Sequence, residues 1–285
     1  MRAMHTEDNR ALGSVTMREQ DYLKHKQYRD ASNLNARAQL HARFSANRWG
    51  WHRWVFDQLR LHPGCRILEV GCGPGMLWRE NLDRMPDGCE AILTDLSTGM
   101  LEEARASLGP TATRFRMAAA DAQHLPFPDE HVDVVVANHM LYHVPDLEKA
   151  LAEFRRVLRP AGRFYAATNG RNHMRELHAW LAQFGARLPL GASLIERSFG
   201  LGTGKRLLAP WFSEVRLERY EGHLDVREVE PLMAYILSTT AKADLVGEKL
   251  EHCTGFFEQI LREQGAIRIS KDTGLLTAVR GEESA

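Results

Sequence analysis

The sequence predicts an α/β fold built on a doubly wound, mostly parallel sheet, and three observations lead to this prediction. An apolar run at residues 66–70 breaks directly into closely spaced glycines, as in a strand that ends in a ligand-binding turn. Strand-like and helix-like segments then alternate as far as residue 168. Polar side chains follow the ends of successive strands. Alternation of this kind gives right-handed crossovers and places ligand loops at the carboxyl ends of the strands.

The first strand and its turn, residues 66–78, read Arg-Ile-Leu-Glu-Val-Gly-Cys-Gly-Pro-Gly-Met-Leu-Trp. Gly71, Gly73 and Gly75 permit a tight turn and the close approach of a ligand, because no Cβ stands in the way. The helix that follows would present unpaired N–H groups and the positive end of its dipole. Met76 stands where a dinucleotide fingerprint has its last glycine, so a nicotinamide-dependent oxidoreductase is the less favoured interpretation.

Two carboxylates follow the next strands. Asp95 ends the second strand about 20 residues after the glycine turn, as nucleotide-binding folds require, and it can accept hydrogen bonds from both ribose hydroxyls. The alternative is that Asp95 caps the helix that starts near Thr98, although Ser97 is the better candidate for that cap. Asp121 ends the third strand, where the alternative is an ordinary turn residue.

The other elements are predicted from the spacing of apolar residues. In the alternating part we expect strands at 66–70, 91–95, 113–118, 132–138 and 162–168, and helices at 75–84, 98–108 and 146–158. Before it, residues 17–61 have helical spacing, with breaks at Ser32–Asn35 and Asn47–Gly50. After it we expect helices at 171–184, 228–240 and 244–263, a glycine-rich loop at 185–204, and strands at 215–220 and 274–279.

Composition limits the function. A chain of 285 residues accommodates one α/β domain with insertions, and its 37 basic and 37 acidic residues create no overall field that favours nucleic acid or an anionic membrane. The four cysteines form no C-x-x-C pair, which suits free thiols in a reducing cytosol. Neither a signal peptide nor a membrane helix of roughly 20 apolar residues is visible. We therefore expect a soluble, cytoplasmic protein; a homodimer is compatible with the sequence, which does not determine the oligomeric state.

Four ordered motifs give the chain a family resemblance. The series Glu69-x-Gly71-x-Gly73-x-Gly75, then Asp95, then Asp121-Ala122, and finally the fourth-strand stretch from Asn138 to His143 resemble the motifs of class I S-adenosylmethionine-dependent methyltransferases. The chain is most similar to the ubiquinone/menaquinone-type small-molecule enzymes, over roughly residues 66–168. The resemblance implies a seven-stranded, Rossmann-like sheet in the order 3-2-1-4-5-7-6. It also implies S-adenosylmethionine as cofactor and methyl transfer to oxygen or nitrogen of a small organic acceptor.

The last two strands form a terminal hairpin in that family, so the resemblance also implies a domain division. It comprises a helical N-terminal lid at 1–60, a core at 61–221 and 271–285, and a helical cap insertion at 222–270. Nucleic-acid amino-methyltransferases commonly carry two prolines after the fourth strand. The stretch Asn138-His139-Met140-Leu141 has none, so a nucleic acid substrate is disfavoured.

The resemblance assigns roles to individual residues. Asp95 would bind the ribose, Asp121 the adenine amino group, and the carbonyl of Asn138 the methionine ammonium. The implied cofactor-binding residues are Glu69, Gly71, Gly73, Gly75, Asp95, Leu96, Asp121, Ala122 and Asn138, with Tyr28 and Arg37 as lid residues over the methionine carboxylate. For these last two, a packed tyrosine and a solvated arginine are an equally good interpretation.

His139 and His143 are the candidates for a general base, because imidazole titrates near neutral pH and both follow the fourth strand. Histidines in such a turn are often only hydrogen-bonded structure, and a carbon nucleophile needs neither. The His-x-x-x-His spacing lacks the carboxylate of a metal motif, so no metal is expected. A non-catalytic protein that binds the cofactor as a sensor or assembly partner is the alternative function.

Overall fold

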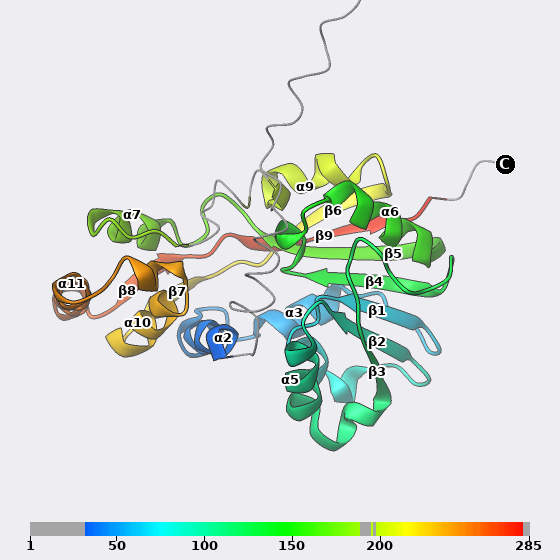
Figure 1. Cartoon of the computed structure of the whole chain (residues 1–285), viewed down its shortest axis with the longest axis horizontal. Helices are drawn as coiled ribbons and strands as arrows, with labels where there is room; N and C mark the ends of the chain where they lie inside the picture. The colour runs from blue at the N-terminus through cyan, green and yellow to red at the C-terminus, as the bar shows by residue number, and fades with distance from the viewer. Residues whose placement is uncertain (1–31, 189–194, 196–197, 282–285) are drawn as a thin grey trace, which may run out of the picture.

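The computed structural model describes residues 32–188, 195 and 198–281, and its centre is a seven-stranded sheet (Figure 1). The strand order is β3-β2-β1-β4-β5-β9-β6, the order that the sequence resemblance implies. The strands β1 to β5 are parallel, and β9 is antiparallel to both of its neighbours. The strands are β1 (Arg66–Val70), β2 (Glu90–Asp95), β3 (Phe115–Ala119), β4 (Val132–Asn138), β5 (Leu158–Asn169), β6 (Ser213–Arg219) and β9 (Thr273–Val279).

Helices cover both faces of this sheet, as the doubly wound prediction requires (Figure 1). The apolar run of β4 shows why: Val134 and Val136 pack into the core on one face and Val135 into the core on the other. On one face lie α3 (Trp51–Gln58), α4 (Met76–Arg79), η2 (Leu82–Arg84), α5 (Thr98–Leu108) and η3 (Gly109–Arg114); on the other lie η4 (Leu141–His143), α6 (Leu147–Val157) and α9 (Leu201–Leu208).

A third apolar core holds a smaller unit beside the sheet, which we call the cap. Its elements are α2 (Ser32–Phe44), α7 (Arg175–Gln183), β7 (His223–Val226), α10 (Val229–Leu237), η5 (Thr240–Ala243), α11 (Glu248–Gln264) and β8 (Ile267–Ser270). The chain enters the cap after β5 and β6 and leaves it into the start of β9. The cap is therefore attached at the carboxyl edge of the parallel strands, where α/β folds bind ligands (Figure 1).

The structure corrects three sequence-based expectations. The stretch Ser32–Asn35 is not a break, because it forms the first turn of α2. The insertion is not purely helical, because β7 and β8 form a separate antiparallel pair. Their apolar side chains are buried, but they alternate with polar residues over only four positions in each strand, too few for the pattern to be recognised in the sequence. The glycine-rich loop contains the helix α9, in which Gly204 is needed because a Cβ there would collide with the side chain of Leu276.

We expect Phe164→Ala to lower the free energy of unfolding by about 3–5 kcal/mol. The ring is fully buried, 5.3 Å from the ring of Phe154 and 5.1 Å from that of Phe212, so its removal leaves a cavity that the sheet cannot close. Urea unfolding at constant m-value measures the change. Val246→Ala is the control, because this side chain is 64% exposed and the expected change is within about 0.5 kcal/mol. A loss below about 1 kcal/mol for Phe164→Ala would contradict this packing.

Candidate functional site

The glycine turn after β1 is enclosed by two segments that are distant in the sequence. Gly71, Gly73 and Gly75 have φ angles of 68°, 53° and 71°, the left-handed region that glycine adopts without strain. A Cβ on Gly71 would lie 2.8 Å from the Cβ of Met140, in the turn after β4. A Cβ on Gly73 would lie 3.5 Å from the side chain of Leu34 in α2. The turn therefore needs glycine at Gly71 for close packing, and α2 lies directly over it.

Asp95 joins the ends of β1 and β2. Its Oδ2 accepts a hydrogen bond from Gly73 N at 3.0 Å, and its Oδ1 accepts one from Ser97 N at 2.9 Å. Burial raises the pKa of this carboxyl group, and the two N–H donors counteract the shift. Ser97, not Asp95, is the side chain that caps α5, through a bond from Met100 N. Leu96, which follows Asp95, remains partly exposed at this edge.

The loop after β3 lies beside this position, since Ala120 N donates to the carbonyl of Asp95 at 3.1 Å. Asp121 closes a tight turn: its Oδ1 accepts from Gln123 N at 2.9 Å, and both of its oxygens accept from the Gln123 amide. Ala122 is buried. In this structure Asp121 thus makes the contacts of an ordinary turn residue. An adenine would have to compete with Gln123 for the carboxylate.

The end of β4 places Asn138 and His139 next to α3. Asn138 Oδ1 accepts from Trp51 Nε1 at 3.2 Å, and the Trp51 ring lies 5.0 Å from the ring of His139. His139 has φ 58°, which is uncommon for a residue with a side chain and is found often at functional sites. Its Nε2 lies 3.5 Å from Thr273 Oγ1 at the start of β9. Sequence reasoning missed Trp51, whose aromatic spacing in a helix indicated only core packing.

The two candidate histidines face different neighbours. Burial lowers the pKa of both to about 3, so both imidazoles are neutral at pH 7. After burial, the charges of His52 and Lys271 contribute most to the lowered pKa of His139. For His143, the charge of Arg37 in α2 contributes most after burial. His139 therefore borders α3 and β9, and His143 borders α2.

Arg37 connects α2 to the segment that follows α10 within the cap. Its Nε donates to Ser238 Oγ at 3.1 Å and its Nη2 to the Ser238 carbonyl at 2.8 Å. It lies one helical turn from Leu34, which covers the glycine turn, and close enough to His143 to affect its pKa. The other lid candidate, Tyr28, lies outside the described residues.

Glu69 lies beneath the turn and is only 2% exposed. Its Oε2 accepts a hydrogen bond from Trp78 Nε1 at 2.6 Å. Burial raises the pKa of Glu69 to about 8, and the Trp78 bond reduces the shift without cancelling it. The side chain thus links β1 to α4 as a largely protonated carboxyl group at neutral pH.

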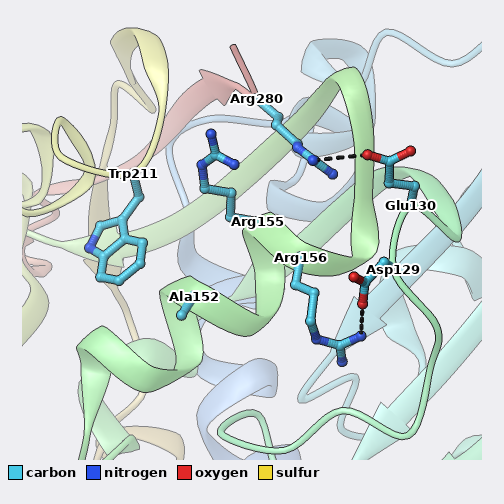
Figure 2. Close-up of a pocket in the computed structure, with 7 residues that line it drawn as sticks. All are labelled: Asp129, Glu130, Ala152, Arg155, Arg156, Trp211 and Arg280. Atoms are coloured by element: carbon cyan, nitrogen blue, oxygen red, sulfur yellow. Dashed lines mark hydrogen bonds and ion pairs between the residues drawn. The ribbon is translucent and has the colours of Figure 1, made fainter. Parts of the chain in front are cut away.

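A separate recess of about 340 Å³ is lined by residues of the loop before β4, of α6 and of the chain just after β9 (Figure 2). Its acidic side chains already have cationic partners: Asp129 accepts from Arg156 at 2.8 Å and Glu130 from Arg280 at 3.0 Å, beside Trp211. Because Asp129 and Glu130 precede β4, this recess is far along the strands from the glycine turn. We assign it no function.

Among residues 32–188, 195 and 198–281, no three His, Cys, Asp or Glu side chains lie close enough together to hold a metal ion. Within the same residues, no helix combines the length and the apolar character needed to cross a bilayer.

The comparisons with known proteins agree with this geometry. Residues 68–166 match the methyltransferase domain family. A demethylmenaquinone methyltransferase of Symbiobacterium thermophilum is 36% identical over 138 residues, which are 47% of this chain and 53% of that protein. A malonyl-[acyl-carrier protein] O-methyltransferase of Geobacter sulfurreducens is 41% identical over 114 residues, 40% of this chain and 42% of that protein. The chain thus spans about half the length of the curated relatives it matches.

A solved structure extends the likeness in fold. The phosphoethanolamine N-methyltransferase 2 of Haemonchus contortus, in complex with S-adenosyl-L-methionine, superposes with a TM-score of 0.57 at 17% identity, over 92% of this chain and 60% of that one. The fold is that of the class I S-adenosylmethionine-dependent methyltransferases. Residues 68–166 of this chain form a methyltransferase domain of that class, which confirms the resemblance seen in the four motifs.

The buried Glu69 gives a pH prediction. In the unfolded chain this carboxyl group loses its proton near pH 4.5, whereas in the folded protein it keeps the proton up to about pH 8. Between these values the folded state binds more protons, so the Glu69 contribution to stability is lost as the pH rises, by at most about 1.4 kcal/mol per pH unit.

We expect Glu69→Gln, which keeps the acceptor for Trp78, to remove this contribution. The difference in free energy of unfolding, parent minus variant, should fall steadily between pH 5 and pH 8 in urea titrations. A difference that is constant across this range would mean that Glu69 is ionised in the folded protein.

Proposed function

We propose that this protein is an S-adenosylmethionine-dependent methyltransferase that methylates oxygen or nitrogen of a small organic acceptor. The observation that carries the proposal is the contact between Asp95 and Gly73, because it brings the ribose-binding carboxylate and the glycine turn together at the carboxyl edge of the sheet. The match to the methyltransferase domain over residues 68–166 supports the same cofactor. Relatives named for a quinone precursor and for a malonyl group support a small acceptor.

The residues present fit the ribose of this cofactor. The left-handed glycines carry no Cβ in the turn, over which Leu34 of α2 lies. The carboxylate of Asp95 can exchange its backbone donors for ribose hydroxyls. When bound, S-adenosylmethionine supplies an electrophilic methyl group on a sulfonium. The chain would contribute alignment, which is worth about 7–11 kcal/mol in favourable cases, and exclusion of water by α2 and Trp51.

His139 is the better placed of the two candidate catalytic residues, because it borders both Asn138 and the start of β9. A pKa of about 3 makes the imidazole a weak base but leaves it a neutral hydrogen-bond acceptor. We propose that the neutral His139 imidazole accepts a hydrogen bond from the O–H or N–H group of the acceptor and so orients the nucleophilic atom. The proton of that group is released to solvent as the methyl group is transferred. His143, next to Arg37 under α2, remains the second candidate.

The non-catalytic alternative is less favoured. A sensor that only binds the cofactor has no counterpart among the relatives reported above, which are named as methyltransferases. We also propose that the protein works in the cytoplasm, with its four cysteines as free thiols, and does not act on nucleic acid, given its zero net charge. A homodimer remains a hypothesis that light scattering would check.

Calorimetric titration with S-adenosylmethionine and S-adenosylhomocysteine tests the cofactor. We expect both to bind the parent protein and Asp95→Asn to weaken both roughly 10- to 100-fold, because a hydrogen bond to a charged group is worth about 1.5–3 kcal/mol. Asp83→Asn, on the exposed surface, is the control and should bind like the parent. Binding of NAD in place of both ligands would refute the proposal.

Arg37 has a test of its own. If Arg37 holds the methionine carboxylate, Arg37→Met should weaken S-adenosylhomocysteine about tenfold and leave 5′-methylthioadenosine, which lacks the carboxylate, unchanged. Arg43→Met is the matched control, because Arg43 also joins α2 to another part of the cap, through Glu228 before α10 at 2.5 Å. Equal weakening of both ligands would show that Arg37 acts only by holding α2 to Ser238.

A further inference from the structure

His139 belongs to a group of four basic side chains that come from four separate segments. We call this group the basic cluster: His41, His139, His173 and Lys271. They come from α2, the end of β4, the loop between β5 and α7, and the turn between β8 and β9. The rings of His41 and His173 are stacked with centroids 6.2 Å apart. The charge of Lys271 contributes to lowering the pKa of all three imidazoles. The next residue, Asp272, donates from its backbone N to His173 Nδ1 at 3.3 Å.

No ion pair joins an acid to the basic cluster among the described residues. Lys271 forms none there, although burial only lowers its pKa to about 8 and leaves it mostly protonated at pH 7. Glu221 and Asp272 line the same cavity as Lys271. Two acids in adjoining segments are already engaged. Asp272 pairs with Arg219, and Glu176 accepts from Ser270 Oγ at 2.6 Å and Ser270 N at 2.8 Å. An uncompensated ammonium inside a protein is costly unless a ligand pairs with it.

Two buried polar atoms at the same place also lack a partner within the described part of the chain. They are His41 Nδ1 and Asn169 Oδ1. Asn169 ends β5 directly opposite Thr273, the residue beside His139 Nε2. A buried polar atom left without a hydrogen bond costs about 1–3 kcal/mol, so such atoms are rare outside sites that receive a ligand.

A continuous set of contacts leads from the basic cluster to the proposed methyl donor site. Lys271 Nζ lies 4.7 Å from the centroid of the Tyr220 ring, Tyr220 packs on Trp51, and Trp51 donates to Asn138. Lys271, Tyr220 and Thr273 also line a cavity of about 220 Å³. An acceptor with an acidic group at Lys271 would thus extend along an aromatic wall toward His139.

We propose that the basic cluster binds the acidic group of the methyl acceptor, a carboxylate or a phosphate, and so selects anionic acceptors. This proposal deepens the proposed function and rests on it, since it names the substrate class of the same site. Lys271 supplies the charge, while the neutral imidazoles of His41 and His173 donate hydrogen bonds. His139 stands between this group and the methyl donor.

The test uses the full chain saturated with S-adenosylhomocysteine and three aromatic probes: benzoate, its neutral isostere benzamide, and phenyl phosphate. We expect at least one anion to bind tenfold or more tightly than benzamide and to shift the imidazole NMR signals of His41 and His173. The preferred anion distinguishes a carboxylate acceptor from a phosphate acceptor. Lys271→Met should abolish the preference for the anion, Lys271→Arg should retain it, and the exposed Lys149→Met should bind like the parent.

Benzamide binding as tightly as both anions, or an anion preference that survives in Lys271→Met, would overturn the proposal. Titration of S-adenosylhomocysteine into the same variants separates it from the proposed function. All variants should bind this ligand equally. If the parent fails to bind it, the proposed function is wrong, whereas normal binding without an anion preference refutes the basic cluster alone.

Discussion

The hydrogen bond from Gly73 N to the Asp95 carboxylate is the interaction on which the geometry of the site depends. It fixes the turn after β1 to the end of β2, and Ala120 N extends the connection to the loop after β3. A left-handed backbone at Gly71 then lets Met140 approach from the end of β4. Four loops are thereby held at one edge of the sheet by hydrogen bonds and close packing, so the side chains they carry need little reorganisation to meet a ligand.

Charge is distributed unevenly across this edge. Glu69 beneath the turn keeps its proton to about pH 8, and the imidazoles of His139 and His143 are neutral because burial and neighbouring cations lower their pKa values to about 3. Asp95, Arg37 and Lys271 are thus the charged groups that can meet charged parts of ligands. In the proposed function, the methyl donor lies at Asp95 and Arg37, and an anionic acceptor meets the opposite charge at Lys271.

Local signals explain what could be predicted from the sequence. The strand 132–138 and the helix 98–108 are found at their expected bounds, since an apolar run and a serine cap are encoded within a few residues. The pair β7 and β8 and the helix α9 were missed because tertiary packing stabilises short, polar segments there. Trp51 and Lys271 gave no motif, since their neighbours come from segments far away in the chain. The roles of the individual site residues stay predictions.

The division between core and cap has a consequence for how acceptor choice arises. The methyltransferase domain match covers residues 68–166, which include the glycine turn, Asp95 and Asn138 but none of the cap. Of the basic cluster, only His139 lies within this range; His41, His173 and Lys271 belong to α2 and to the segments that join the cap to β5 and β9. In the proposed function, donor binding would thus be encoded by the core that matches the family, and acceptor binding by segments inserted around it. Because the cap is attached at the ligand edge, changes in its sequence can alter the acceptor without disturbing the Asp95 contact.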